Sequence, residues 1–179
     1  WVPEEGEDGD YISFGTKLLF TCEELPGLSV AAEICEDVWG PNPPSIGHAL
    51  AGATVIVNCS ASDETTGKNL YRESLIGGQS ARLVCGYIYA NAGEGESSQD
   101  LVFGGHNIIA ENGTILAEAK RFSNGIIYTE FDVQKIANER RKNTTFTETQ
   151  EHVLPRIPFG LEQTETILTR TFPSRPFVP

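Results

Sequence analysis

The run "TVIVNCSAS", from Thr54 to Ser62, decides the fold. It opens with consecutive β-branched residues, the pattern of a strand covered on both faces. The preceding "LSVAAEIC" (residues 28–35) alternates as a strand does, and the later "GYIYANA" (86–92) is another apolar run. Helical patterns separate the three, one capped by Ser45 and one over about residues 66–85. This alternation of strands and helices predicts a layered α/β fold.

The second half of the chain has a different pattern. Asn112-Gly113 between apolar runs predicts a hairpin, "GIIYTEFDV" (125–133) predicts a further strand, and Asp132 is placed to cap a charged helix. From residue 147 onward the sequence is rich in Thr and Pro and has no period. We therefore expect one domain over 1–146 and an extended arm or linker over 147–179.

The composition excludes several classes of partner. The 179 residues contain 25 acidic and 13 basic side chains, for a net charge of −12. Such a surface repels nucleic acid and anionic membranes, so neither is an expected partner. No apolar run approaches the roughly 20 residues that span a bilayer, and the first residues lack the features of a signal peptide. These features favour a cytoplasmic location.

The cysteines and histidines do not form a metal-binding pattern. The four cysteines show no CxxC pair and no close spacing to histidine, so we expect no metal site. Three of them lie in or beside apolar stretches, where a free cysteine usually behaves as a small buried residue: Cys22, Cys59 and Cys85. The histidines are expected to be solvated or capping residues: His48, His106 and His152.

Cys35 differs from the other cysteines because it ends a predicted strand ahead of a Pro-rich turn. Reactive groups of α/β folds gather at the carboxyl ends of parallel strands, where following backbone N–H groups can face an oxyanion. However, Glu33, Glu36 and Asp37 would each oppose a negative charge on its sulfur. Cys35 is therefore either structural or a nucleophile activated by a cation and a base from elsewhere.

Three segments carry a family resemblance: "EICEDVWGPNPPS", "LAGATVIVNCSAS" and "GYIYANAGEGESSQDLVFGGHNIIAENGTILAE". Together, in register from about residue 11 to about 146, they resemble the nitrilase-type glutaminase domain of glutamine-dependent NAD synthetases. The resemblance implies a nitrilase-like α-β-β-α sandwich and a Glu-Lys-Cys triad whose cysteine attacks the side-chain amide of L-glutamine. By resemblance, the matching positions are Cys35 as nucleophile, Glu36 as oxyanion N–H donor, Ser62 and Lys68 as glutamine-binding residues, and Trp39 as a pocket residue.

The match to the family pattern is incomplete. Trp39 equally suits ordinary core packing, and Lys68 often corresponds to arginine in relatives. The family's triad glutamate and lysine lie upstream of the cysteine, and Lys17 matches neither of them. We therefore expect the C-terminal portion of the domain, truncated on its N-terminal side and inactive by itself.

The resemblance also implies a synthetase domain of the same chain, expected after residue 179. That domain uses ATP and Mg to amidate deamido-NAD with the released ammonia, so no cofactor is expected within these residues. The intact protein is expected to be a homo-oligomer. Two alternatives remain open: another carbon-nitrogen hydrolase, such as an ω-amidase or nitrilase, and a non-catalytic interaction module of the same fold.

Overall fold

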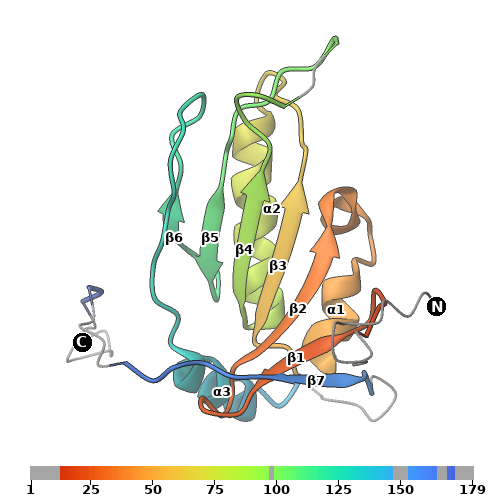
Figure 1. Ribbon diagram of the computed structural model, residues 1–179, viewed down its shortest axis with the longest axis vertical. Coiled ribbons are helices and arrows are strands. Elements are labelled where there is room, and N and C mark those ends of the chain that lie inside the picture. Colours follow the sequence, from red (N-terminus) through yellow and green to blue (C-terminus); the bar gives the residue numbers. More distant parts are fainter. Residues whose placement is uncertain (1–12, 97–98, 147–152, 165–168, 172–179) are drawn as a thin grey trace, which may run out of the picture.

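The computed structural model describes residues 13–96, 99–146, 153–164 and 169–171. These residues form one seven-stranded sheet with the order β6-β5-β4-β3-β2-β1-β7 (Figure 1). The strands are β1 (Leu19–Cys22), β2 (Ser29–Ile34), β3 (Val55–Ser60), β4 (Gly86–Asn91), β5 (Ile108–Glu111), β6 (Thr114–Glu118) and β7 (Arg156–Phe159). The helices are the 3-10 turn η1 (Cys35–Trp39) and the α-helices α1 (Pro44–Leu50), α2 (Lys68–Leu83) and α3 (Val133–Lys142).

The centre of the sheet is parallel. β2 pairs with β3 and β3 with β4 in parallel register, while β5 and β6 continue the sheet as an antiparallel hairpin. The carboxyl ends of β2, β3 and β4 therefore share one edge of the sheet. The predicted α/β class is confirmed, and so is the alternation of strand and helix from β2 to β4.

Helices cover one face of the sheet. α2 packs on β4, β5 and β6, and α1 packs on β2 and β3 (Figure 1). Ile56, Tyr87 and Ile76 lie fully buried in this layer. Among the described residues this supplies one helix layer and one sheet of the expected sandwich. No helix of the described part is long and apolar enough to cross a membrane.

The other face of the sheet becomes exposed toward the carboxyl end of β3. Val55 is buried, Val57 is half-buried and Cys59 is exposed, and Ile34 on β2 is 60% exposed. The predictions that β3 is covered on both faces and that Cys59 is buried are therefore wrong. The reason is that alternate side chains of a strand point to opposite faces, and no described element covers the second face here.

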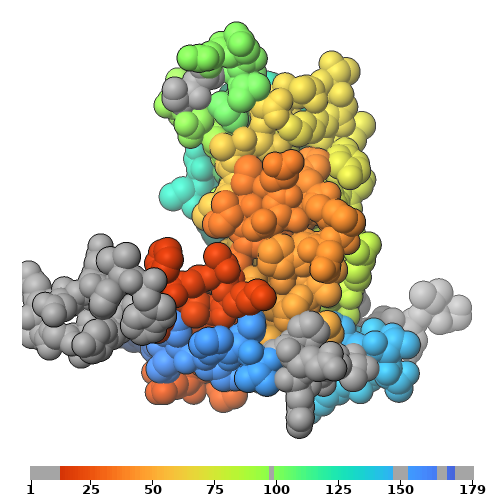
Figure 2. Space-filling model, turned by 90° about the vertical axis from the view of Figure 1, so that its right-hand side faces the viewer, coloured from red at the N-terminus to blue at the C-terminus, as the bar shows by residue number. Residues whose placement is uncertain are grey.

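The tail contributes a strand of its own. β7 pairs in parallel with β1, from Leu19 opposite Arg156 to Cys22 opposite Phe159. Figure 2 shows the blue residues of this strand lying against the red residues of β1. The strand prediction for residues 125–133 was wrong, because residues 125–132 lie outside any strand and α3 begins at Val133.

The predicted turn and one of the two predicted helix caps are confirmed, and the other cap is not. Asn112 and Gly113 both have positive φ, of 44° and 87°, as a two-residue hairpin turn requires. Asp132 caps α3 by accepting a hydrogen bond from the backbone N–H of Lys135 at 2.8 Å. Ser45 is not a cap, because α1 already begins at Pro44. The backbone N–H of Ser45 donates to Glu33 Oε2 at 2.8 Å, so a carboxylate of β2 satisfies the first turn of α1.

Candidate active site

Cys35 lies at the turn from β2 into η1, in a backbone conformation that residues other than glycine rarely adopt. Its φ is +49°, in the left-handed region, where a non-glycine residue is strained by roughly 1–2 kcal/mol. An open hollow of about 630 Å³ surrounds it. The lining residues are Ile34, Cys35, Glu36, Asp37, Gly40, Asn42 and Pro44. The thiol thus lies at the carboxyl edge of the parallel strands, where α/β folds bind ligands.

The carboxylates around Cys35 mainly hold the chain in place. Asp37 accepts a hydrogen bond from the backbone N–H of Ile34 at 2.8 Å. Glu33 is 2% exposed and accepts hydrogen bonds from the Tyr87 hydroxyl and the backbone of Ser45. Glu36 and Asp37 are both exposed, whereas Glu33 is buried. Two of the three carboxylates near the thiol, Glu33 and Asp37, therefore also fix the turn.

A buried amide connects Cys35 to the interior. Asn58, on β3, accepts from the Cys35 N–H at 3.0 Å and donates to the Cys35 carbonyl at 3.3 Å. It also donates to the Tyr87 hydroxyl at 3.2 Å, and that hydroxyl donates to Glu33. Burial, with Glu33 nearby, raises the pKa of Tyr87, so the phenol stays protonated.

Ser62 is held on both its backbone and its side chain. Its N–H donates to Asn91 Oδ1 at 2.8 Å, and Asn91 Nδ2 donates to its carbonyl at 3.0 Å. Arg72 Nη2 donates to the Ser62 Oγ at 3.2 Å. Because arginine has only donors, the Ser62 oxygen accepts there, and the hydroxyl hydrogen is left for another acceptor.

Lys68, at the start of α2, approaches the 3-10 turn that contains Cys35. Its ammonium forms an ion pair with Asp63 and lies 5.6 Å from the centre of the Trp39 ring. The Lys68 hydrogen bond is the main reason that the pKa of Asp63 is lowered. Trp39 also stacks against Tyr71 at 5.2 Å. The structure thus brings Lys68 and Trp39 together, whereas Ser62, Lys68 and Trp39 do not line the hollow at Cys35.

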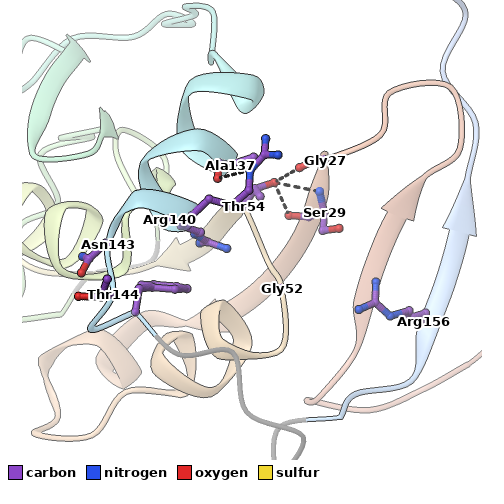
Figure 3. Close-up of a pocket in the computed structure, with 11 residues that line it drawn as sticks. Gly27, Ser29, Gly52, Thr54, Ala137, Arg140, Asn143, Thr144 and Arg156 are labelled. Atoms are coloured by element: carbon purple, nitrogen blue, oxygen red, sulfur yellow. Dashed lines mark hydrogen bonds between the residues drawn. The ribbon is translucent and has the colours of Figure 1, made fainter.

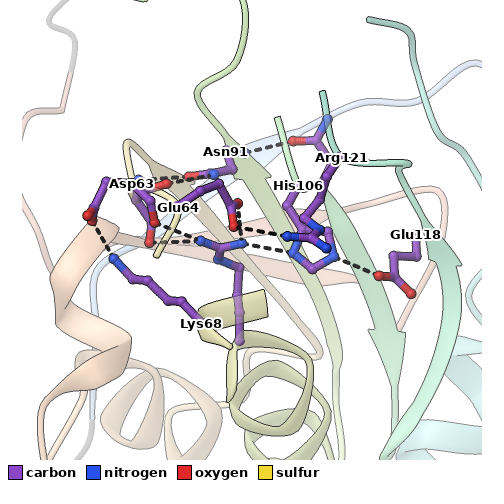
Figure 4. A network of polar contacts seen from close by, with 10 residues as sticks. Asp63, Glu64, Lys68, Asn91, His106, Glu118 and Arg121 are labelled. Atoms are coloured by element: carbon purple, nitrogen blue, oxygen red, sulfur yellow. Dashed lines mark hydrogen bonds and ion pairs between the residues drawn. The ribbon is translucent and has the colours of Figure 1, made fainter. Parts of the chain in front are cut away.

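A buried polar network that no sequence pattern indicates lies at this edge. Arg72, fully buried, donates to Glu64 Oε1 at 2.8 Å and to His106 Nδ1 at 2.8 Å. His106 Nε2 lies 2.6 Å from Glu118. Figure 4 shows His106 and Glu118 at one end of this network and Lys68 with Asp63 at the other. The partners lie on separate elements, so no local spacing could have revealed them.

Two histidine predictions are corrected by the structure. His106 is 1% exposed and His48 is 3% exposed, so neither is solvated. Atoms of Glu73, His106 and Glu118 lie within 4.8 Å of one another, as metal ligands would. However, Nδ1 accepts from Arg72 and Nε2 therefore donates to Glu118, so this ring has no lone pair free for a metal. His152 lies outside the described residues.

A second hollow, of about 650 Å³, lies at the opposite edge of the sheet (Figure 3). Arg140 of α3 donates there to the carbonyls of Ala53, Leu83 and Val84. Thr54 likewise bonds to the backbone of residues 27 and 29. The Arg140 bonds fasten α3 to the amino ends of β3 and β4, and the Thr54 bonds hold the chain before β3 to the start of β2, so we assign this hollow a structural role.

Residues 2–141 match the carbon-nitrogen hydrolase family, and the chain belongs to that family. The chain is 40% identical to a glutamine-dependent NAD(+) synthetase of Mycobacterium tuberculosis over 194 aligned positions, which cover 99% of this chain and 29% of that protein. It therefore spans 29% of the length of this curated relative.

Solved structures support the same fold. The glutamine-dependent NAD+ synthetase of Acinetobacter baumannii, in complex with ADP, aligns with a TM-score of 0.59 at 20% identity, over 75% of this chain and 26% of that one. Saccharomyces cerevisiae Nit3, of the nitrilase superfamily, aligns with a TM-score of 0.55 at 23% identity, over 69% and 44%. These likenesses establish the nitrilase-like fold.

Proposed function

We propose that this chain is the glutamine-hydrolysing part of a glutamine-dependent NAD synthetase, with Cys35 as the nucleophile. The observation that carries the proposal is the position of Cys35, on a strained turn at the carboxyl end of a parallel strand and beside an open hollow. Family membership and the 40% identity over nearly the whole chain support it. They also favour glutamine over other amides.

The proposed reaction has two stages. The Cys35 sulfur bonds to the amide carbon of glutamine, the carbonyl electrons move to oxygen, and the backbone N–H of Glu36 stabilises that oxyanion. The C–N bond then breaks, and the leaving nitrogen takes up the thiol proton to depart as ammonia. Water adds to the thioester in the second stage, releasing glutamate and restoring the thiol.

The substrate's α-carboxylate is assigned to Ser62 and Lys68. A hydroxyl hydrogen and an ammonium are suitable donors for a carboxylate, and the bond from Arg72 leaves the Ser62 hydrogen free to donate. Lys68 would exchange its bond to Asp63 for one to the substrate. Trp39, beside Lys68, would form an apolar wall of the pocket.

The lining of the hollow indicates what else the reaction needs. Its described residues include Glu36 and Asp37 but no Lys, Arg or His. A thiolate beside carboxylates without a cation is disfavoured. We therefore propose that the triad lysine and glutamate come from outside the described residues, and that this chain alone hydrolyses glutamine poorly.

The remaining parts of the proposal concern the whole protein. A synthetase domain of the same chain would consume the ammonia in amidating deamido-NAD, and ATP and magnesium would bind there. None of the residues discussed above is assigned to hold them. We also propose a cytoplasmic location and a homo-oligomer.

A chloroketone analogue of glutamine provides the test. In the full-length protein it should label Cys35, identified by peptide mass spectrometry, and it should abolish glutamine-dependent synthesis of NAD while ammonia-dependent synthesis continues. Cys35→Ala should have the same split effect. Equal turnover of glutamine and simple ω-amides would favour a different carbon-nitrogen hydrolase, and absence of labelling together with unchanged activity of Cys35→Ala would refute the proposal.

A further inference from the structure

Asn58 is the described side chain that bonds to both backbone groups of Cys35. The Cys35 N–H can only donate and the Cys35 carbonyl can only accept. The amide oxygen of Asn58 must therefore face the N–H, at 3.0 Å, and its nitrogen the carbonyl, at 3.3 Å. These contacts fix the orientation of the amide without reference to any other neighbour.

A second pair of side chains holds this amide from behind. Asn58 Nδ2 also donates to the Tyr87 hydroxyl, which donates in turn to Glu33. All three side chains are almost fully buried, with Asn58 1%, Tyr87 0% and Glu33 2% exposed. Glu33 is fixed at its other oxygen by the Ser45 N–H. Since every donor in this chain of hydrogen bonds has an acceptor, the Asn58 amide has one stable orientation.

The strained turn explains why such support is needed. Cys35 has a φ of +49° and no glycine-like freedom, so its conformation persists only where surrounding contacts impose it. Asp37 fixes the preceding N–H, of Ile34, but it does not bond to Cys35 itself. The two Asn58 bonds act on the strained residue directly.

We propose that Asn58 is a positioning residue for the nucleophile, with Tyr87 and Glu33 orienting its amide. The role rests on the proposed function of Cys35 in amide hydrolysis. Without the clamp, the backbone of Cys35 relaxes toward ordinary φ values, and both the sulfur and the following N–H of Glu36 move relative to a bound amide. Substrate binding at Ser62 and Lys68 does not depend on this movement, so the effect falls on kcat rather than KM.

The test compares three variants of the full-length protein. Asn58→Leu removes both bonds to Cys35, Tyr87→Phe removes only the support behind the amide, and Ser60→Ala is the matched control. Ser60 donates to the same Asn58 oxygen at 3.2 Å but has no bond to Cys35. Unfolding midpoints establish that each variant is folded.

Two readouts are needed. Deuterium exchange at the Cys35 amide should accelerate about fivefold in Asn58→Leu, the equivalent of one net hydrogen bond, less in Tyr87→Phe, and not in Ser60→Ala. The kcat for glutamine should fall about 100-fold in Asn58→Leu, as for a displacement of about 1 Å, with KM within a few-fold of wild type.

The outcomes separate the two proposals. Unchanged exchange in a folded Asn58→Leu would overturn the clamp, and faster exchange with an unchanged kcat would overturn its positioning role. An equal loss of kcat in Ser60→Ala would also overturn the positioning role, because the effect would then be common to the strand and not specific to the Asn58 bonds. If the wild-type protein hydrolyses no glutamine, the proposed function fails, and the exchange result alone then decides whether Asn58 holds Cys35.

Discussion

Arg72 donates from Nη1 to Nδ1 of His106 over 2.8 Å, and both side chains are buried. The same guanidinium contacts Ser62 and Glu64. A buried arginine with four acceptors around it, the fourth being the carbonyl of Asp63, uses its planar geometry in a way that a lysine cannot reproduce. The network therefore connects the stability of this edge of the sheet with the orientation of a proposed substrate-binding hydroxyl.

Arg72→Lys should therefore lower both stability and substrate affinity. Leaving His106 without its partner, and Glu64 with only the more distant Arg121 at 3.7 Å, is expected to cost about 3 kcal/mol of unfolding free energy, measured by urea denaturation. The KM for glutamine should rise because Ser62 loses its fixed orientation. Arg82→Lys is the matched control, since Arg82 lies exposed on the same helix and should change stability by less than about 0.5 kcal/mol. Equal urea midpoints of unfolding for Arg72→Lys and Arg82→Lys would contradict this account.

Substitutions at Lys68 test the proposed carboxylate site. Lys68→Met should raise the KM for glutamine roughly 10- to 100-fold, the value of a charge-assisted hydrogen bond, whereas Lys68→Arg should retain most of the affinity. Asp63→Asn should instead lower the KM for glutamine, because it releases the Lys68 ammonium from its ion pair with Asp63. Steady-state kinetics on the full-length protein decide between these outcomes, and a KM indifferent to all three would remove Lys68 from the site.

His48 should make folding stability depend on pH in the weakly acidic range. Burial lowers the pKa of His48 below its ordinary value of 6.5, and the nearby Glu33 carboxylate only partly opposes this. The unfolded chain therefore takes up the proton at a higher pH than the folded chain does. Stability should be full above that ordinary value and should fall as the pH drops below it.

The measurement is urea unfolding of wild type and His48→Gln at about pH 8 and about pH 5.5. Wild type should lose more stability between the two conditions than the variant does. The carboxyl groups with lowered pKa, such as Asp63, lose their contributions only at more acidic pH, so they do not confuse the comparison. Parallel losses in the two proteins would exclude His48 as the source.

The four cysteines should alkylate in an order set by burial. Burial raises the pKa of Cys85 to about 12, and Cys22 is also buried. Cys59 is exposed and Cys35 is partly exposed. Iodoacetamide at about pH 8 should therefore modify Cys59 and Cys35 in the native protein and the other two only in urea, as followed by peptide mass spectrometry. Native labelling of Cys85 would contradict the described packing.

The sequence was informative where local pattern determines structure. The strands at residues 28–35 and 86–92, the Asn112-Gly113 turn and the Asp132 cap depend on neighbouring residues, and each was predicted correctly, although the strand expected at 125–133 was not found. The errors involve partners that are distant along the chain. Ser45 resembled a cap until Glu33 of another element proved to satisfy its N–H, and His106 looked solvated because its partners lie on α2 and β6.

Asn58 shows the same limit within the candidate site. It lies in the motif that supported the family resemblance, yet nothing in its neighbours along the chain indicates a bond to Cys35, 23 residues earlier. Parallel pairing of β2 with β3, which places Ile34 opposite Cys59, creates this contact. The sequence motifs indicate which residues to propose for the site, whereas the contacts that hold Cys35 depend on strand register.

Strain at Cys35 predicts an unusual order of stability among its variants. In most strands and helices glycine is less stable than alanine by about 0.5–1 kcal/mol, because it loses more backbone freedom on folding. At φ +49°, however, alanine retains a left-handed penalty of roughly 1–2 kcal/mol that glycine does not have. Cys35→Gly should therefore be at least as stable as Cys35→Ala, by up to about 1 kcal/mol in urea unfolding. Ala31, a buried residue of β2, provides the control: Ala31→Gly should be less stable than the wild type, which has alanine there. If glycine is the less stable at both positions, Cys35 does not store strain, and the need for a clamp by Asn58 disappears with it.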